Sequence, residues 1–382
     1  MNGLDDVIAA DTVLSDADGQ SGTLIIRGRS LDELAASSSC EEVLALLWNG
    51  WFEAAPDNLS AALGRARVQA FARLGPVDPH LLRQDPVAVL RALLARLEDG
   101  ESLDTALQLV AATTVFTAAI LRLRRGLDPV PPDATAPHAS DLLRMTHGEP
   151  PRAPQIAALD RYLVTVSDHG LNASTFAARV VASTRAGLTS SVLAALSALK
   201  GPLHGGAPGP VLDCLDSIGA PERAASWLRE KLARGERLMG FGHRIYRVRD
   251  PRADSVKSAL QMLVRAGAID PNRLRLAEAV EAAALHLLAQ KKPDRPLPTN
   301  VEFYTALLLE ALGFPREAFT CIFAAARVGG WIAHAREQII GGRLIRPRSR
   351  YVGPRPALSG ETALQAARCL PPSPRGAGHP AA

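Results

Sequence analysis

The 382-residue sequence predicts an all-α fold, and three observations support this. Apolar residues recur at three- and four-residue intervals over four long segments, which are residues 85–100, 189–201, 220–235 and 275–290. Only one segment, Gly22–Gly28, has the composition of a β-strand. Strands therefore do not alternate with helices as an α/β fold would require.

Several helix ends can be located from side-chain chemistry. Thr189 is the expected N-cap of the second segment, because its hydroxyl can accept a backbone hydrogen bond. Asp250 stands before a proline at what would be the first helical position of another helix. Gly219 and Gly313 follow apolar helical runs, where a left-handed residue commonly ends a helix.

The most apolar stretch, residues 109–121, predicts a buried helix rather than a membrane span. It is too short to cross roughly 30 Å of hydrocarbon, and it contains three threonines. Proline and polar residues at 127–140 and 291–300 predict breaks between helices. The composition of residues 371–382 predicts a disordered tail.

Composition argues against several classes of function. The net charge is only +4, the basic residues are dispersed and aromatic residues make up 4% of the chain, which together disfavour nucleic-acid binding. The acidic first dozen residues do not resemble an export signal, so we expect a cytoplasmic location. The cysteines are widely spaced, which disfavours a disulfide scaffold or a structural zinc site; they are Cys40, Cys214, Cys321 and Cys369.

Two histidines in glycine-flanked turns and one carboxylate are the candidate catalytic residues. They are His204 in GPLHGG, His243 in MGFGHR and Glu302 in NVEFY. A base and neutral hydrogen-bond donors are what a site needs to form an enolate beside a thioester and to stabilise it. Glycine next to each histidine lets the substrate approach the backbone closely. The spacing of these residues therefore predicts a substrate pocket rather than a metal site. The glycine-rich segments also match neither nucleotide-binding template.

Six blocks of sequence resemble the citrate synthase family and occur in the order found there. They are residues 167–184, 199–213, 239–253, 300–315, 326–338 and 344–353. The resemblance is greatest to the short dimeric citrate and 2-methylcitrate synthases of bacteria and archaea. It implies a large helical domain (1–204 and 310–382), a small helical domain (205–309) and an active-site cleft between them. In the family, binding of oxaloacetate closes this cleft, which excludes water from the reaction.

The resemblance also implies roles for individual residues. Glu302 removes a proton from the acyl-CoA, His204 stabilises the enol, and His243 polarises the oxaloacetate carbonyl. The substrate's two carboxylates suit planar guanidinium groups, and the implied oxaloacetate-binding residues are His169, Arg252, Arg327 and Arg346. Arg346 would come from the neighbouring subunit of a homodimer. The implied CoA-binding residues are Gly240, Gly242, Arg244 and Lys257, although a solvated basic face explains the last two equally well. No metal or redox cofactor is implied.

Three departures from the family pattern leave alternatives open. Glu302 replaces the usual aspartate of NVDFY, Pro208 replaces asparagine in HGGAN, and Gly170 replaces glutamate in DHELN. The extra methylene of Glu302 moves the carboxylate by roughly 1 Å, a displacement that can cost on the order of 10²-fold in rate. The alternatives are a 2-methylcitrate or longer alkylcitrate synthase and a non-catalytic relative that binds oxaloacetate or CoA. A third alternative, a basic helical protein that binds nucleic acid, predicts DNA binding that depends strongly on salt concentration.

Overall fold

The computed structural model describes residues 7–52, 58–205 and 208–354, so the expected disordered tail at 371–382 lies outside the described residues. Helices dominate these ranges, and the all-α prediction is confirmed. The first helices are α1 Leu31–Ser37, α2 Cys40–Trp48, α3 Leu59–Arg73, α4 Pro79–Leu82, α5 Pro86–Leu94, α6 Leu103–Leu123, α7 His138–His147 and α8 Ala153–Thr165. The remaining helices are α9 Ala173–Ala182, α10 Leu188–Leu199, α11 Pro208–Ile218, α12 Ala224–Ala233, α13 Pro251–Arg265, α14 Pro271–Lys291, α15 Val301–Ala311 and α16 Phe319–Gly341.

A small antiparallel sheet precedes the helices. Its strands are β1 Ser15–Asp18, β2 Thr23–Ile26 and β3 Arg29–Ser30, in the order β1-β2-β3. The segment predicted as a strand forms β2, whereas β1 and β3 were not predicted. The β1 sequence SDAD has no β-branched or aromatic residue, so pairing with β2 rather than intrinsic propensity makes it a strand.

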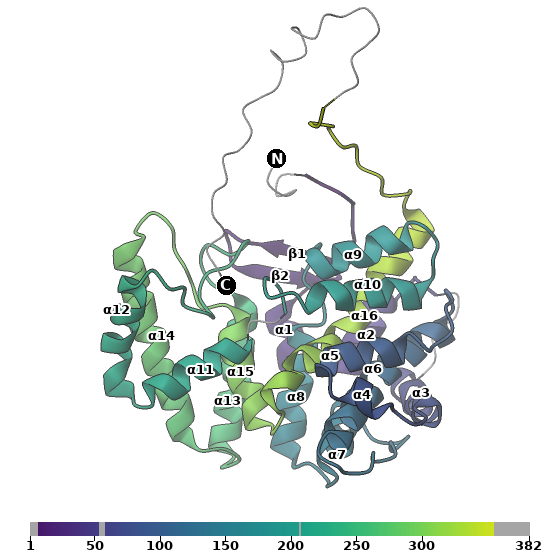
Figure 1. The fold of residues 1–382 in the computed structure, drawn as a ribbon, viewed down its shortest axis with the longest axis horizontal. Helices are drawn as coiled ribbons and strands as arrows, with labels where there is room; N and C mark the ends of the chain where they lie inside the picture. Colours follow the sequence, from purple (N-terminus) through teal and green to yellow (C-terminus); the bar gives the residue numbers. More distant parts are fainter. Residues whose placement is uncertain (1–6, 53–57, 206–207, 355–382) are drawn as a thin grey trace, which may run out of the picture. The chain divides into compact units, whose positions relative to one another are not determined.

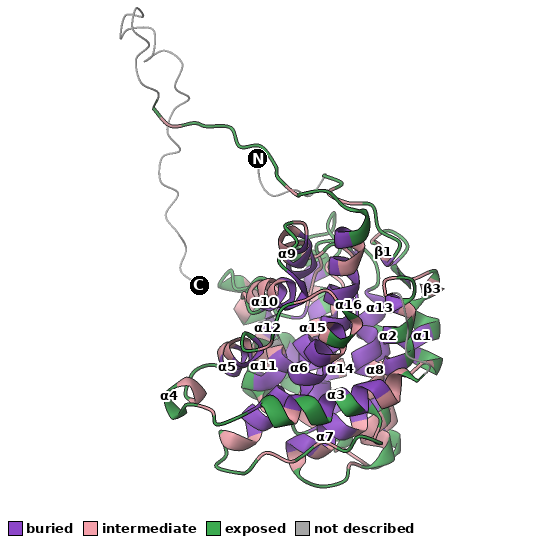
Figure 2. Cartoon of the chain, turned by 90° about the vertical axis from the view of Figure 1, so that its right-hand side faces the viewer, coloured by how far each residue is buried: buried purple, intermediate pink, exposed green. Residues whose placement is uncertain are grey.

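The core is built around two long apolar helices, α6 and α16. Helices α9 and α10 pack on α16, while α3 and α5 pack on α6. Figure 2 shows α6 and α16 almost entirely in the colour of buried residues. By length and composition both helices could cross a membrane, but they are mostly buried inside the protein, as core helices are. The predicted burial of residues 109–121 is therefore confirmed.

The observed helix ends confirm most of the predicted caps. Asp250 is the N-cap of α13, and its side chain accepts the hydrogen bond from the backbone N–H of Arg252. The prediction for Thr189 is wrong, because α10 begins two residues earlier than expected, at Leu188, with Gly187 as N-cap. The Asp99 carboxylate, from a neighbouring loop, accepts the backbone N–H of Thr189 at 2.8 Å instead.

Helices α11 to α15 form the part of the chain that the sequence assigns to a small domain. In Figure 1 α12 and α14 lie together at one end of the helical body, and α3 and α7 lie at the other. Residues 1–344 form one compact unit, so the division at residues 205 and 309 stays a prediction. Of the described residues, 345–354 belong to a second unit, in which the Tyr351 hydroxyl donates to the Pro354 carbonyl at 2.7 Å.

Candidate functional site

The His243 turn and the start of α15 are joined by backbone hydrogen bonds. The Gly242 N–H donates to the Pro298 carbonyl at 2.7 Å, and the Asn300 N–H donates to the Gly240 carbonyl at 2.9 Å. The Asn300 side chain adds two bonds, because its Nδ2 donates to the Gly242 carbonyl at 2.9 Å and its Oδ1 accepts the Glu302 N–H at 3.1 Å. Two motifs almost sixty residues apart in sequence therefore form one rigid corner.

Glycine is required at two positions of this corner. Gly240 has φ +85°, and a Cβ there would lie 2.8 Å from the Phe303 ring. Gly242 has φ +83°, and a Cβ there would lie 2.8 Å from the Leu297 side chain. Both conformations are ones that other residues adopt only with strain. The two glycines have a clear packing role here, and their predicted contact with CoA stays a prediction.

The backbone that follows His243 donates to one of its ring nitrogens. Its Nδ1 accepts the N–H groups of Ile245 at 3.0 Å and Tyr246 at 3.2 Å. Burial, followed by the charge of Arg252, lowers the pKa of His243 to about 4, so the ring is neutral at pH 7. The two backbone contacts favour an unprotonated Nδ1 and a ring proton on Nε2. His243 is thus a neutral imidazole that can donate from Nε2 in this tautomer.

Arg252 faces that same nitrogen. Its Nη2 lies 3.0 Å from His243 Nε2, and its Nε and Nη2 donate to the two oxygens of Asp250 at 3.0 and 2.9 Å. Asp250 also accepts the Val301 N–H at 3.1 Å, which ties α13 to the start of α15. A guanidinium only donates, so in this contact His243 Nε2 accepts from Arg252 Nη2. An oxygen atom of a bound substrate beside both groups would allow Nη2 and a protonated Nε2 to donate to it instead.

Arg327 on α16 is a buried cation with unused bonding capacity. Its side chain is 1% exposed, and its Nε donates to the Val166 carbonyl. Its Nη2 is buried without a hydrogen-bond partner among the described residues, and no described carboxylate lies within ion-pair distance. Burial lowers the pKa of Arg327 to about 10, which still leaves the group charged at pH 7. An unpaired buried guanidinium is costly, so this geometry is typical of an anion-binding site.

His169 lies between these groups and the large helices. Its Nε2 is 3.1 Å from the Tyr246 hydroxyl, and its ring packs edge-on against His243 with centroids 5.5 Å apart. Burial, with the charges of Arg252 and His243 next, holds the pKa of His169 well below its usual range. His169 and His243 are therefore both neutral at pH 7, and His169 is in direct contact with the His243 corner.

His204 follows α10 and is held by a hydroxyl from α9. Its Nε2 lies 2.9 Å from Ser174 Oγ, which also accepts the indole N–H of Trp331 at 3.1 Å. The edge of Phe323 packs against the ring at 6.4 Å between centroids. Burial is the main cause that lowers the pKa of His204 to about 4, and the positive charges of Arg327 and Arg252 act in the same direction. His204 is thus a neutral hydrogen-bonding group.

Glu302 lies in the first turn of α15 and is partly buried. Burial raises the pKa of Glu302 to about 7, although the charges of Arg252 and Arg327 act in the opposite direction. The same two arginines influence the pKa of His204, so Glu302, the two arginines and this histidine share one electrostatic environment. A carboxylate that titrates near neutral pH is well matched to proton abstraction.

The other predicted residues lie outside this cluster or cannot be placed against it. Lys257 pairs with Glu281 at 2.9 Å and stacks over Tyr304, which favours a structural role. Arg244 is exposed on the turn after His243. Arg346 is exposed in the second unit. For these three residues the binding roles stay predictions.

Sequence reasoning missed several residues that organise the site. Ser174 and Trp331 hold His204, Tyr246 holds His169, and Asn300 joins the two motifs. The position of Tyr246 three residues after His243 was a usable signal. Ser174 and Trp331 lie in the family-like blocks 167–184 and 326–338, but their contact with His204 depends on packing between helices distant in sequence.

The site contains no grouping of metal ligands among the described residues. Elsewhere, Cys40, Glu41 and Asp160 lie close enough together to hold an ion. Their atoms already bond to one another and to the backbone, because Glu41 accepts the Cys40 thiol at 3.0 Å and the His138 N–H at 2.7 Å. These contacts account for the cluster without an ion.

Comparison with known proteins identifies close relatives of this sequence. The family described as citrate synthase, C-terminal domain, matches residues 3–348. The chain is 37% identical over 369 residues to a citrate synthase of Haloferax volcanii, covering 92% of this chain and 95% of that protein. It is also 37% identical over 366 residues to a 2-methylcitrate synthase of Mycobacterium tuberculosis, covering 92% of this chain and 90% of that protein.

Solved structures agree with the sequence relatives. The crystal structure of citrate synthase from Thermotoga maritima has a TM-score of 0.80 at 32% identity, over 94% of this chain and 97% of that one. A ternary complex of carboxymethyl coenzyme A and oxaloacetate with citrate synthase from Thermoplasma acidophilum has a TM-score of 0.80 at 27% identity, over 92% of this chain and 96% of that one.

Proposed function

The chain belongs to the citrate synthase family and is a transferase of that type, and on this premise we propose that it condenses acetyl-CoA with oxaloacetate and hydrolyses the product to citrate and CoA. The observation that carries the proposal is the grouping of one carboxyl of raised pKa with neutral histidines and an unpaired buried guanidinium. Each group matches one demand of the reaction.

Oxaloacetate is the first substrate to consider. Its carboxylates fit the unpaired Nη2 of Arg327 and the guanidinium of Arg252, and its ketone oxygen fits between Arg252 Nη2 and the Nε2–H of His243. Donation from His243 draws electron density from the ketone and makes its carbon electrophilic. His169, fixed by Tyr246, lines the same pocket.

Enol formation is the task of Glu302 and His204. The Glu302 carboxylate takes a proton from the carbon next to the thioester carbonyl, and charge moves to the thioester oxygen. Ser174 has one hydroxyl proton, and its two candidate acceptors are His204 Nε2 and Asn172 Oδ1, at 2.9 and 2.8 Å. When Ser174 donates to His204, the imidazole carries its proton on Nδ1 and can donate to the enol oxygen. The enol carbon then attacks the ketone, and water cleaves the thioester to release CoA.

The experiment is oxaloacetate-dependent release of free CoA thiol. Glu302→Gln should lower the rate by roughly 10²- to 10⁴-fold, because it removes the base and keeps the side-chain size. Glu317→Gln, at an exposed glutamate, is the matched control and should keep wild-type activity. No CoA release by the wild-type protein from any acyl-CoA would refute the enzyme proposal and favour a non-catalytic protein that binds oxaloacetate or CoA.

A second candidate is 2-methylcitrate synthase, with propionyl-CoA as the acyl donor. It is favoured by a 2-methylcitrate synthase relative with the same 37% identity as the citrate synthase relative. Glu302 in place of aspartate also changes the reach of the base. Rates with acetyl-CoA and propionyl-CoA at fixed, saturating oxaloacetate distinguish the two functions, and a higher kcat/KM for propionyl-CoA would overturn the first.

The active form is proposed to be a cytoplasmic homodimer in which Arg346 of each chain reaches the neighbouring oxaloacetate pocket. No metal or redox cofactor is proposed, because proton abstraction by Glu302 and charge stabilisation by neutral donors meet the chemical demand. CoA release is therefore expected to survive dialysis against a chelator.

A further inference from the structure

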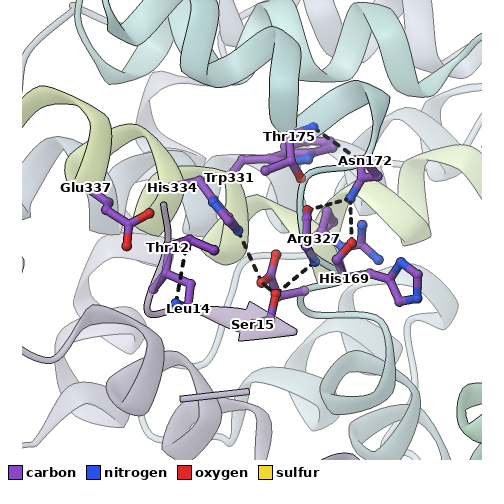
Figure 3. A network of polar contacts seen from close by, with 12 residues as sticks. Thr12, Leu14, Ser15, His169, Asn172, Thr175, Arg327, Trp331, His334 and Glu337 are labelled. Carbon is purple, nitrogen blue, oxygen red and sulfur yellow. Dashed lines mark hydrogen bonds and ion pairs between the residues drawn. The ribbon is translucent and has the colours of Figure 1, made fainter. Parts of the chain in front are cut away.

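The N-terminal hairpin formed by β1 and β2 contacts the turns that carry both oxaloacetate histidines. At its base, Ser15 Oγ donates to Asp168 Oδ2 at 2.5 Å and accepts the Gly170 N–H at 2.8 Å. His169 lies between these two residues, so one hydroxyl fastens both sides of the histidine. Figure 3 shows Ser15 at the strand, between the His334 ring and the His169 turn.

Asp168 is held on a second side by His334. Arg179 Nη1 donates to His334 Nδ1 at 2.9 Å, which leaves the ring proton on Nε2. That Nε2 donates to Asp168 Oδ2 at 3.2 Å. The same carboxylate oxygen therefore accepts from both Ser15 and His334, whereas Oδ1 is buried without a partner. Asp168 is fully buried, at 0% exposure, so its position depends on these few contacts.

The position of Asp168 matters because Arg327 is nearby. The two side chains influence each other's pKa, yet they form no ion pair among the contacts of the described residues. Gly330, three residues after Arg327 on α16, lets the 167–168 segment approach the helix, since a Cβ there would lie 2.3 Å from the Ser167 carbonyl oxygen and 3.2 Å from Asp168 Oδ1. Ser15 and His334 thus compete with Arg327 for Asp168. While they hold it, the Arg327 Nη2 stays available to another anion.

The tip of the hairpin contacts the other histidine turn. The Arg247 N–H donates to the Gly19 carbonyl at 2.8 Å. A Cβ on Gly19 would lie 2.1 Å from the Ile245 carbonyl oxygen, so only glycine permits this approach. The N–H of Ile245 is one of the two backbone donors that hold His243 Nδ1. The hairpin tip therefore supports the segment that orients His243.

We infer that the hairpin is a positioning element of the oxaloacetate pocket, with Ser15 as the positioning residue for His169 and Arg327 and Gly19 as the positioning residue for His243. This inference rests on the proposed function, because it names residues that shape the same site. The hairpin should therefore affect the binding of oxaloacetate and leave the binding of acyl-CoA nearly unchanged.

Ser15→Ala tests the base of the hairpin. The KM for oxaloacetate should rise roughly 10-fold or more, because a hydrogen bond to a charged group is lost and Asp168 is freed to pair with Arg327. The KM for acyl-CoA should change less than about twofold in the same variant. Ser15→Thr keeps the hydroxyl and should restore the wild-type value. Ser21→Ala is the matched control, since it removes an exposed hydroxyl from the same hairpin.

Calorimetric titration with oxaloacetate distinguishes a failure of the role of Ser15 from a failure of the proposed function. Wild-type protein that binds oxaloacetate, with equal affinity in Ser15→Ala, would overturn the role of Ser15 and leave the proposed function standing. Equal changes in the KM values of both substrates would also overturn it, because they indicate general damage. Wild-type protein that does not bind oxaloacetate would overturn both.

Gly19→Ala tests the hairpin tip. The new Cβ must displace the 245–247 segment, so kcat should fall roughly 10-fold or more through misorientation of His243. Gly28→Ala is the control: Gly28 has φ +81° and nothing within 4 Å of a built Cβ, so it carries backbone strain without a clash. Thermal unfolding checks that both variants fold. Equal kcat values for the two alanine variants would contradict the role of Gly19.

Discussion

The titration of Glu302 should control both the rate and the pH dependence of stability. Burial raises the pKa of this carboxyl from its ordinary 4.5 to about 7. That difference corresponds to roughly 3 kcal/mol of free energy. The perturbation that isolates it is Glu302→Gln, which keeps the shape of the side chain and removes the titration.

The sign follows from proton binding. Between its unfolded value near 4.5 and its folded value near 7, Glu302 is protonated in the folded protein and ionised in the unfolded chain. The folded state then binds more protons, so the contribution of Glu302 to stability is complete below the lower value and is lost as the pH rises through about 7. Relative to Glu302→Gln, the wild-type protein should lose roughly 2 to 3 kcal/mol between about pH 5 and pH 8.

Two assays measure these effects. Urea unfolding of the wild-type and Glu302→Gln proteins at each pH gives the difference in their free energies of unfolding. The histidines of lowered pKa contribute in the opposite direction, but equally in both proteins, so their contribution cancels in this difference. The wild-type kcat/KM for acyl-CoA should rise with pH and level off above about 7, because the base must be ionised. Parallel stability curves, or an acid limb near pH 4.5, would refute the reasoning from burial.

Three further predictions concern the groups around the base. Ser174→Ala should lower kcat roughly 10- to 100-fold with little change in either KM, because His204 loses its orienting hydroxyl; steady-state kinetics measure it. Arg327→Met should raise the KM for oxaloacetate roughly 100-fold and leave the KM for acyl-CoA nearly unchanged, since a buried carboxylate contact is lost. If Arg346 serves the neighbouring subunit, mixing Arg346→Ala with Glu302→Gln protein should recover CoA release that neither variant has alone; no recovery on subunit exchange would contradict the shared site.

Local sequence signals account for most of the fold. Helix periodicity located the long helices, because an apolar face must recur every three to four residues to be buried. The sequence could not locate β1, whose SDAD residues become a strand only through pairing with β2. The misplaced N-cap at Thr189 has a similar cause, since the capping carboxylate of Asp99 comes from ninety residues away.

The site was predictable to the extent that it lies in motifs. His204, His243 and Glu302 stand in short recognisable segments. In the structure the charge of Arg252 influences the pKa of all three. The residues that orient them lie elsewhere in the chain. Ser174 is thirty residues from His204, and Ser15 is 153 residues from Asp168. Such pairs depend on tertiary packing, which no local pattern records.

Under the proposed function, glutamate at position 302, where the family resemblance implies aspartate, acts on geometry rather than on basicity. The ordinary pKa values of the two side chains differ by only about 0.4. The start of α15 cannot retreat freely to absorb the extra methylene, because the Asn300 N–H is bonded to Gly240 at 2.9 Å and the Val301 N–H to Asp250 at 3.1 Å. The carboxylate therefore extends roughly 1 Å further toward the substrate. The acyl-CoA carbon that loses the proton must be bound at a matching depth, so the preference between acetyl-CoA and propionyl-CoA reports on the shape of the pocket that faces Glu302.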